Sequence, residues 1–86
     1  MKPSDYIRRG WCQGAIAEDA SGQWLVTPAS LYAVKWCIIG ALRVCNTTQE
    51  DLIRVGEYLG DHPGKWNDTP GRTQEEVIAA LEAVGL

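Results

Sequence analysis

The chain has 86 residues, of which 45% are hydrophobic and 22% are charged, and its formal net charge is −3. These values predict one globular domain spanning residues 1–86 and exclude an intrinsically disordered chain. No apolar run approaches the roughly 20 residues that span a bilayer, so we expect no membrane partner. The acidic balance argues against nucleic-acid binding, because phosphate neutralisation needs a basic surface and Arg8-Arg9 is the only basic pair.

The three cysteines, Cys12, Cys37 and Cys45, are odd in number and irregularly spaced, which is not the pattern of a disulfide framework. On one helix the α-carbons of Cys37 and Cys45 would lie about 12 Å apart, which is too far for a disulfide. Met1 is followed by no apolar signal segment. We therefore expect a cytoplasmic protein with free thiols.

The first half of the chain predicts a short helical turn over residues 3–9 and then a β-hairpin. Glycines at both ends of the segment Gly10-Trp11-Cys12-Gln13-Gly14 indicate a turn or a close backbone approach. Two short segments flank Ser21-Gly22, which is typical of a hairpin turn and places the hairpin near residues 15–26.

The strongest predicted element is a helix over about residues 28–45. Thr27 is a good N-cap and Pro28 suits the first helical position. Apolar residues then recur at helical spacing, which predicts a central, largely buried helix. This stripe is formed by Leu31, Val34, Ile38, Ala41, Leu42 and Cys45.

Two further helices are predicted over about residues 48–59 and 73–84. Thr48 caps the first, and Gly60 ends it. Pro70-Gly71 predicts a type II turn, after which Thr73 and Glu76 form a capping box. The fold class is therefore mainly α: a small bundle of three main helices with a short hairpin. Four Trp residues are expected to fill much of its core, with backbone carbonyl groups accepting their indole protons.

Two sets of residues could form a catalytic site or a metal-binding site if the fold brought them together. Cys37, His62 and Asn67 follow the chain order of a cysteine hydrolase, but Cys37 falls about ten residues into the predicted helix, among apolar neighbours that keep a thiol protonated. A zinc site with all of Cys12, Cys37, Cys45 and His62 fails because one helix cannot bring positions 37 and 45 together, which leaves open only a three-ligand site that omits one cysteine. We expect neither a metal nor a cofactor, and a solvated loop position for His62.

The loop from Trp66 to Thr73 is the best candidate for a binding site, and Gln13 joins it as a second candidate. Backbone N–H groups at the start of the last helix would hold an anion, with Arg72 adding donors. The alternative is structural: Asn67 and Asp68 tie the turn by side-chain hydrogen bonds, and Arg72 pairs with Asp68. The candidate ligand or partner residues are Gln13, Asn67, Asp68, Arg72 and Thr73.

Four segments of the chain carry a recognisable pattern: Gly10-Trp11-Cys12-Gln13-Gly14, the run from Trp36-Cys37 to Gly40-Ala41-Leu42, Trp66-Asn67-Asp68, and Arg72-Thr73 with Glu76-Val77. In this order they resemble a family of small uncharacterised bacterial and phage proteins. The family pattern reads GWxQG, WCxxGAL, WND and RTxxEV, and members often carry a longer helix before the first segment. The resemblance implies no activity, since none is assigned to such proteins.

Taken together, the sequence favours a small non-catalytic cytoplasmic binding or interaction protein of bacterial or phage origin. Its expected partner is another protein or a second copy in a homodimer. Two alternatives stay open: a small hydrolase or transferase that uses Cys37, and a nucleic-acid-associated protein.

Overall fold

The computed structural model describes all of residues 1–86 as five helices and three two-residue strands. No helix has the length and apolar character that crossing a bilayer requires. In chain order the elements are α1 (Pro3–Arg9), β1 (Ala17–Glu18), β2 (Trp24–Leu25), β3 (Lys35–Trp36), α2 (Ile38–Val44), α3 (Gln49–Leu59), α4 (Pro63–Asn67) and α5 (Gln74–Ala83).

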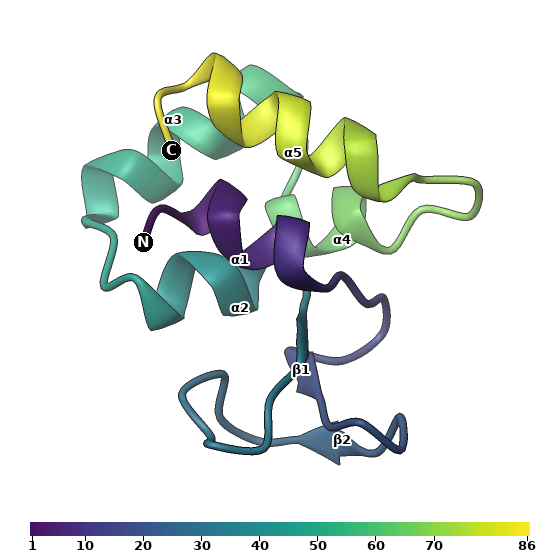
Figure 1. The fold of residues 1–86 in the computed structure, drawn as a ribbon. Coiled ribbons are helices and arrows are strands. Elements are labelled where there is room, and N and C mark those ends of the chain that lie inside the picture. Colours follow the sequence, from purple (N-terminus) through teal and green to yellow (C-terminus); the bar gives the residue numbers. More distant parts are fainter.

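The helices form a body, and the strands with their loops project from one end of it (Figure 1). Helix α1 lies at the centre of the body, where it packs against both α2 and α5. The core of the body is built from fully buried aliphatic side chains of several elements. Among these are Ile7, Ile38, Leu42, Val77 and Leu81.

The three strands form a small antiparallel sheet in the order β2-β1-β3. We call residues 17–35 the arm. The outer side of β3 makes a parallel bridge from Trp36 to Trp11, which joins the arm to the body. The predicted hairpin is confirmed: Ala17 pairs with Leu25 and Glu18 with Trp24. Its turn is tied by the Asp19 carboxylate, which accepts hydrogen bonds from the N–H groups of Ser21 and Gln23.

The predicted helix over residues 28–45 is wrong in its first half, because only Ile38–Val44 is helical. Thr27 and Ser30 use their hydroxyl groups to form tight turns, accepting from the N–H groups two residues later. Lys35 and Trp36 are then extended and pair with β1. The Trp36 indole N–H donates to the carbonyl of Pro28 at 2.9 Å, which fixes the loop against the sheet. The contact between Trp36 and Pro28 and the pairing of β3 with β1 thus outweigh the helical preference that the apolar spacing indicates for this segment.

The later predictions are closer to the structure. Helix α3 begins after the Thr48 cap and ends at Gly60, whose φ of 70° is the left-handed conformation typical of a helix C-cap. The capping box of Thr73 and Glu76 is confirmed at the start of α5. The predicted loop around His62 contains the additional short helix α4, for which His62 is the N-cap. Helix α1 confirms the predicted helical turn over residues 3–9, whereas α4 was not predicted.

Candidate functional site

The buried amide of Asn67 connects three segments of the chain. Its Oδ1 accepts from the Trp11 indole N–H at 2.8 Å and from the N–H of Ile38 at 3.0 Å. Its Nδ2 donates to the carbonyl of Cys12 at 3.1 Å and to the Asp68 carboxylate at 2.9 Å. Both donor hydrogens are therefore used, and so are two acceptor positions of a side chain that is fully buried.

Gln13 and Asp68 extend this connection to the surface. The Gln13 amide donates to the carbonyl groups of Asn67 and Thr69, at 2.9 and 3.1 Å. Asp68 accepts from the N–H of Gly14 at 3.0 Å. We call this set of contacts between residues 11–14 and 67–69 the clamp. It brings Gln13, Asn67 and Asp68 together, as a shared site would require.

Arg72 and Thr73 lie beside the clamp and have other partners. The Arg72 guanidinium covers the Trp66 ring, 3.8 Å from its centroid, and its Nε donates to the Trp66 carbonyl at 3.0 Å. It also pairs with Glu76 at 3.0 Å, rather than with Asp68. The Thr73 hydroxyl accepts from the N–H of Glu76, whose carboxylate accepts from the N–H of Thr73.

These contacts pair the buried polar atoms of the clamp, whereas the Gln13 Oε1 and the Asp68 Oδ2 at its surface have no hydrogen-bond partner within the chain. In the whole chain no buried side-chain nitrogen or oxygen lacks a partner. An anion at the start of α5 would compete with the Glu76 carboxylate, which already accepts from the N–H of Thr73 there. That hydrogen bond lowers the pKa of Glu76, with Arg72 adding to the effect, so the carboxylate is charged at neutral pH. Chemically, the clamp can hold residues 11–14 and 67–69 in a fixed position relative to each other.

The three cysteines are free thiols, and the position of Cys37 in the fold differs from the prediction. Cys37 is not inside a helix but is the N-cap of α2, where its sulfur accepts from the N–H of Gly40. Burial nevertheless raises the pKa of Cys37, and it raises the pKa of Cys12 to about 12. Both thiols are therefore protonated at neutral pH. No group of three or more His, Cys, Asp or Glu side chains is arranged to hold a metal ion.

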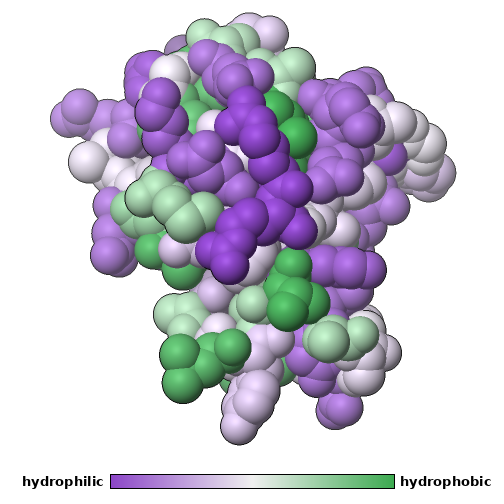
Figure 2. All heavy atoms as spheres, viewed as in Figure 1, coloured by the Kyte–Doolittle hydropathy of each residue, from purple (hydrophilic) through white to green (hydrophobic).

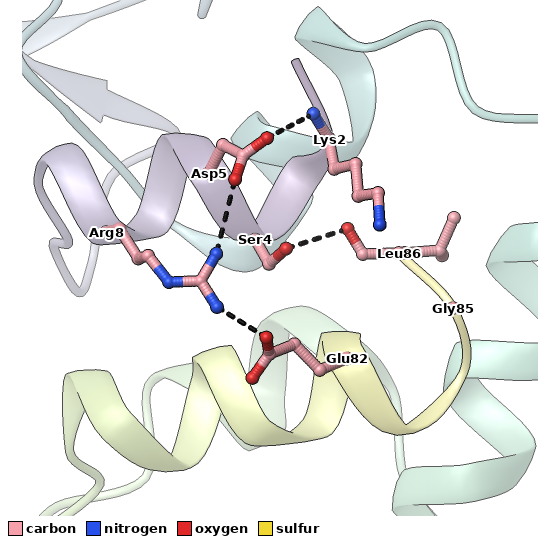
Figure 3. A pocket seen from close by; sticks show the side chains of 7 residues that line it. All are labelled: Lys2, Ser4, Asp5, Arg8, Glu82, Gly85 and Leu86. Atoms are coloured by element: carbon pink, nitrogen blue, oxygen red, sulfur yellow. Dashed lines mark hydrogen bonds and ion pairs between the residues drawn. The ribbon is translucent and has the colours of Figure 1, made fainter.

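The hollows in the surface are shallow. One, of about 250 Å³, lies between α1 and the end of α5 (Figure 3). Three of its charged side chains are paired with each other, since Arg8 lies between Asp5 and Glu82, and the Ser4 hydroxyl donates to the carbonyl of Leu86. These contacts join the two helices. A more apolar hollow of about 320 Å³ lies between α2, α3 and the start of α4 and is lined by Ile39, Leu52 and Ile53.

The most unusual surface of the molecule is on the arm. Trp24 is 71% exposed, Val26 98%, Leu31 100% and Tyr32 76%. We call these four side chains the apolar patch. Green and pale atoms gather on the protruding end of the molecule, whereas the deepest purple lies over the helices (Figure 2). Exposed apolar surfaces of this kind mark interaction sites in soluble proteins.

The sequence prediction missed the apolar patch because it placed Leu31 on the buried face of a helix and expected the Trp residues to be buried. Trp36 meets that expectation, and Trp11 donates to an amide side chain instead of a backbone carbonyl. A signal was nevertheless present in the sequence. None of the eight Lys and Arg or eleven Asp and Glu residues falls between residues 20 and 34.

Comparison with known proteins gives one match. Residues 4–85 match the model of a family described as "Family of unknown function (DUF6197)". The chain belongs to this family. No curated protein and no solved structure matches the chain. Because the match spans nearly every residue, the clamp and the arm both lie within the family domain.

Proposed function

We propose that this member of the family is a small non-catalytic interaction protein, and that it binds a protein partner through the apolar patch of its arm. The observation that carries the proposal is the exposure of Trp24, Val26, Leu31 and Tyr32 on an arm segment without charged residues. Charged residues are depleted, and Trp and Tyr enriched, at the centres of protein interfaces.

The clamp supports this proposal by its chemistry. Gln13, Asn67 and Asp68 were candidates for ligand contact, but the Gln13 Nε2, both amide atoms of Asn67 and the Asp68 Oδ1 bond to the protein itself. We assign them, with Arg72 and Thr73, the role of holding the body together so that the arm is presented rigidly. Bacterial or phage origin is part of the proposal and rests on the resemblance of the four sequence motifs. A cytoplasmic location rests on the three free thiols.

Photo-crosslinking in cells of the source organism tests the proposed surface. A photoreactive amino acid replaces Leu31 in one variant, and in the control it replaces Ile53, which is exposed on α3 of the body. We expect one discrete adduct from position 31 and none from position 53. We also expect Tyr32→Ser to abolish the adduct and Tyr58→Ser, an exposed tyrosine on α3, to leave it unchanged. The absence of an adduct at position 31, or equal adducts at both positions, would contradict the proposal.

The alternative of an enzyme that uses Cys37 has one favourable feature, the position of the sulfur at the N-terminus of α2. Against it stand the burial of the thiol, its raised pKa, and an Asn67 amide already bonded to other groups. Iodoacetamide labelling at pH 7 separates the two ideas. We expect Cys45, the least buried cysteine, to react first, and Cys37 only after unfolding. Rapid labelling of Cys37 in the folded protein would favour the enzyme.

Binding to nucleic acid has weaker support still. Arg8 is neutralised by Asp5 and Glu82, and Arg9 lies over the Trp36 ring, 6.0 Å from its centroid. The only basic pair of the chain is therefore engaged with its own fold.

A further inference from the structure

Strand β2 has an open edge that no other part of the chain covers. In the sheet order β2-β1-β3 it is terminal, whereas the outer side of β3 is bridged to Trp11. The Glu18 carbonyl accepts from the N–H of Val34, and the N–H of Asp19 donates to the Gln23 carbonyl at 3.0 Å. Because backbone groups alternate in direction along a strand, the N–H and C=O of Trp24 face outward at the open edge.

Two side chains of the apolar patch lie in or directly after this strand. Trp24 belongs to β2, and Val26 follows it two residues later, both strongly exposed. Together with Leu31 and Tyr32, these side chains offer on the order of 500 Å² of accessible surface, since an aromatic side chain buries about 150–250 Å². A standard interface buries about 800 Å² on each partner, a little over half of it apolar. The apolar patch is therefore the right size for one stable interface.

The chemistry of the apolar patch suits contact with the same patch on a second copy of the chain. A two-fold interface brings each residue against the same surface of its partner, so a charged patch would repel itself. Residues 20–34 contain no charged side chain, and the net charge of −3 belongs to residues outside this segment. Antiparallel pairing of two identical strands has the two-fold symmetry that a dimer needs.

We infer that the partner bound by the arm is a second copy of this chain, joined by antiparallel pairing of the two β2 strands about Trp24. This inference rests on the proposed function of the arm. In the dimer the N–H of each Trp24 donates to the Trp24 carbonyl of the other copy, and the two indole rings lie side by side across the strands. Leu25 then faces Gln23 of the other copy, and the two sheets become one six-stranded sheet.

Sedimentation equilibrium of the full chain tests whether the partner is a second copy. We expect a dimer that Tyr32→Ser weakens roughly 100-fold, because each substitution occurs twice in a symmetric interface and a buried aromatic anchor accounts for about tenfold or more. Tyr58→Ser, which removes an exposed tyrosine from α3, is the matched control and leaves the dissociation constant unchanged. A dimer that responds equally to both substitutions overturns the inference.

Isotope-filtered NMR of a mixed labelled and unlabelled sample tests the strand pairing. The proposed register places the α-protons of Leu25 and Gln23 of opposite copies in a close, non-hydrogen-bonded pair, so we expect a cross-peak between them. A dimer that depends on Tyr32 but lacks this cross-peak overturns the pairing of the β2 strands.

The outcomes distinguish this inference from the proposed function. The protein could stay monomeric at millimolar concentration and still crosslink through position 31 to another protein in cells. That result would overturn the inference that the partner is a second copy, and it would support the arm as a binding surface for a different protein. A monomer that also gives no adduct at position 31 overturns both. A dimer with the Leu25–Gln23 cross-peak supports both.

Discussion

The clamp and the arm use polar and apolar side chains in opposite ways. At the clamp, the buried Asn67 amide contacts residues from three parts of the chain, and its donors are all used. On the arm, Trp24 and Leu31 are large apolar side chains that contact mainly solvent. The motif residues of the clamp therefore bond within the fold, whereas the uncharged segment between the first two motifs exposes large apolar side chains.

Removal of the Asn67 amide should have the largest effect on stability. Asn67→Ala leaves the indole N–H of Trp11 and the N–H of Ile38 without their acceptor inside the protein. Each buried unpaired group costs about 1–3 kcal/mol, so we expect the free energy of unfolding to fall by about 3–5 kcal/mol in a urea titration. Asn46→Gly is the control, because Asn46 is exposed at a φ of 51° that glycine adopts readily, and we expect a change below about 0.5 kcal/mol. Equal effects of the two would contradict a structural clamp.

The close approach between α2 and residue 16 predicts the next largest effect. A Cβ on Gly40 would lie 2.0 Å from the Ile16 carbonyl oxygen, so we expect Gly40→Ala to lower the free energy of unfolding by about 1–3 kcal/mol. Gly56, inside α3, has no atom closer than 3.7 Å to such a Cβ. Gly56→Ala should therefore stabilise the protein by about 0.5–1 kcal/mol in the same titration. A tolerated Gly40→Ala would show that the two segments separate easily.

Arg72 provides a smaller test of the region beside the clamp. Arg72→Lys removes the planar group that covers Trp66 and the Nε–H that bonds its carbonyl, so we expect a loss of about 1 kcal/mol by thermal unfolding. Arg43→Lys is the comparison, since Arg43 is exposed and forms no ion pair within the chain. If both variants have the melting temperature of the wild type, Arg72 has no stabilising role and its guanidinium is available to bind a ligand.

Substitutions on the arm should weaken association without lowering the stability of the monomer. Leu31→Ser changes a side chain that is fully exposed, so we expect the free energy of unfolding of the monomer to stay within about 0.5 kcal/mol of the wild type. The same variant should associate more weakly than Ile53→Ser in sedimentation experiments. A large loss of monomer stability would mean that Leu31 supports the fold, and the contrast with the clamp would disappear.

Acidification should lower the stability of the fold without changing association through the arm. The helix-cap carboxylate Glu76 has a pKa below its ordinary value of 4.5 because the N–H of Thr73 bonds to it, and Asp51 is lowered chiefly by Arg54. A lowered pKa in the folded state contributes stability above the ordinary value, and that stability is lost as the pH falls through the folded value. We expect the melting temperature to decline below about pH 4.5, while association between pH 8 and 5 stays constant because residues 20–34 contain no carboxyl group or histidine.

Local signals in the sequence predicted the elements that local contacts stabilise. Thr73 with Glu76, Thr48 and Gly60 act within a few residues along the chain, and the structure confirms their caps. The helix over residues 28–45 failed because the contacts that decide it are distant: Trp36 bonds to Pro28, and β3 pairs with β1. Helical spacing alone gives no information on such pairings.

Three residues of the clamp, Gln13, Asn67 and Asp68, were among the predicted candidates, but their partners were not predicted. Gln13 and Asn67 lie 54 residues apart in the sequence and meet only in the folded chain. Arg72 was expected to pair with Asp68, yet Asp68 bonds to Gly14 and Arg72 to Glu76. The apolar patch was not predicted, because the usual inference from an apolar side chain is burial.

Hydrogen exchange at two protein concentrations tests most directly whether the arm, and not the clamp, mediates association. We expect the backbone amides of residues 24–32 to gain protection as the concentration rises from micromolar to millimolar, with the largest gain at Trp24. We expect no change at residues 11–14 and 67–69, whose hydrogen bonds are already formed within one chain. Protection that grows at the clamp, or on the helices while the arm stays unprotected, would show that the arm does not mediate association.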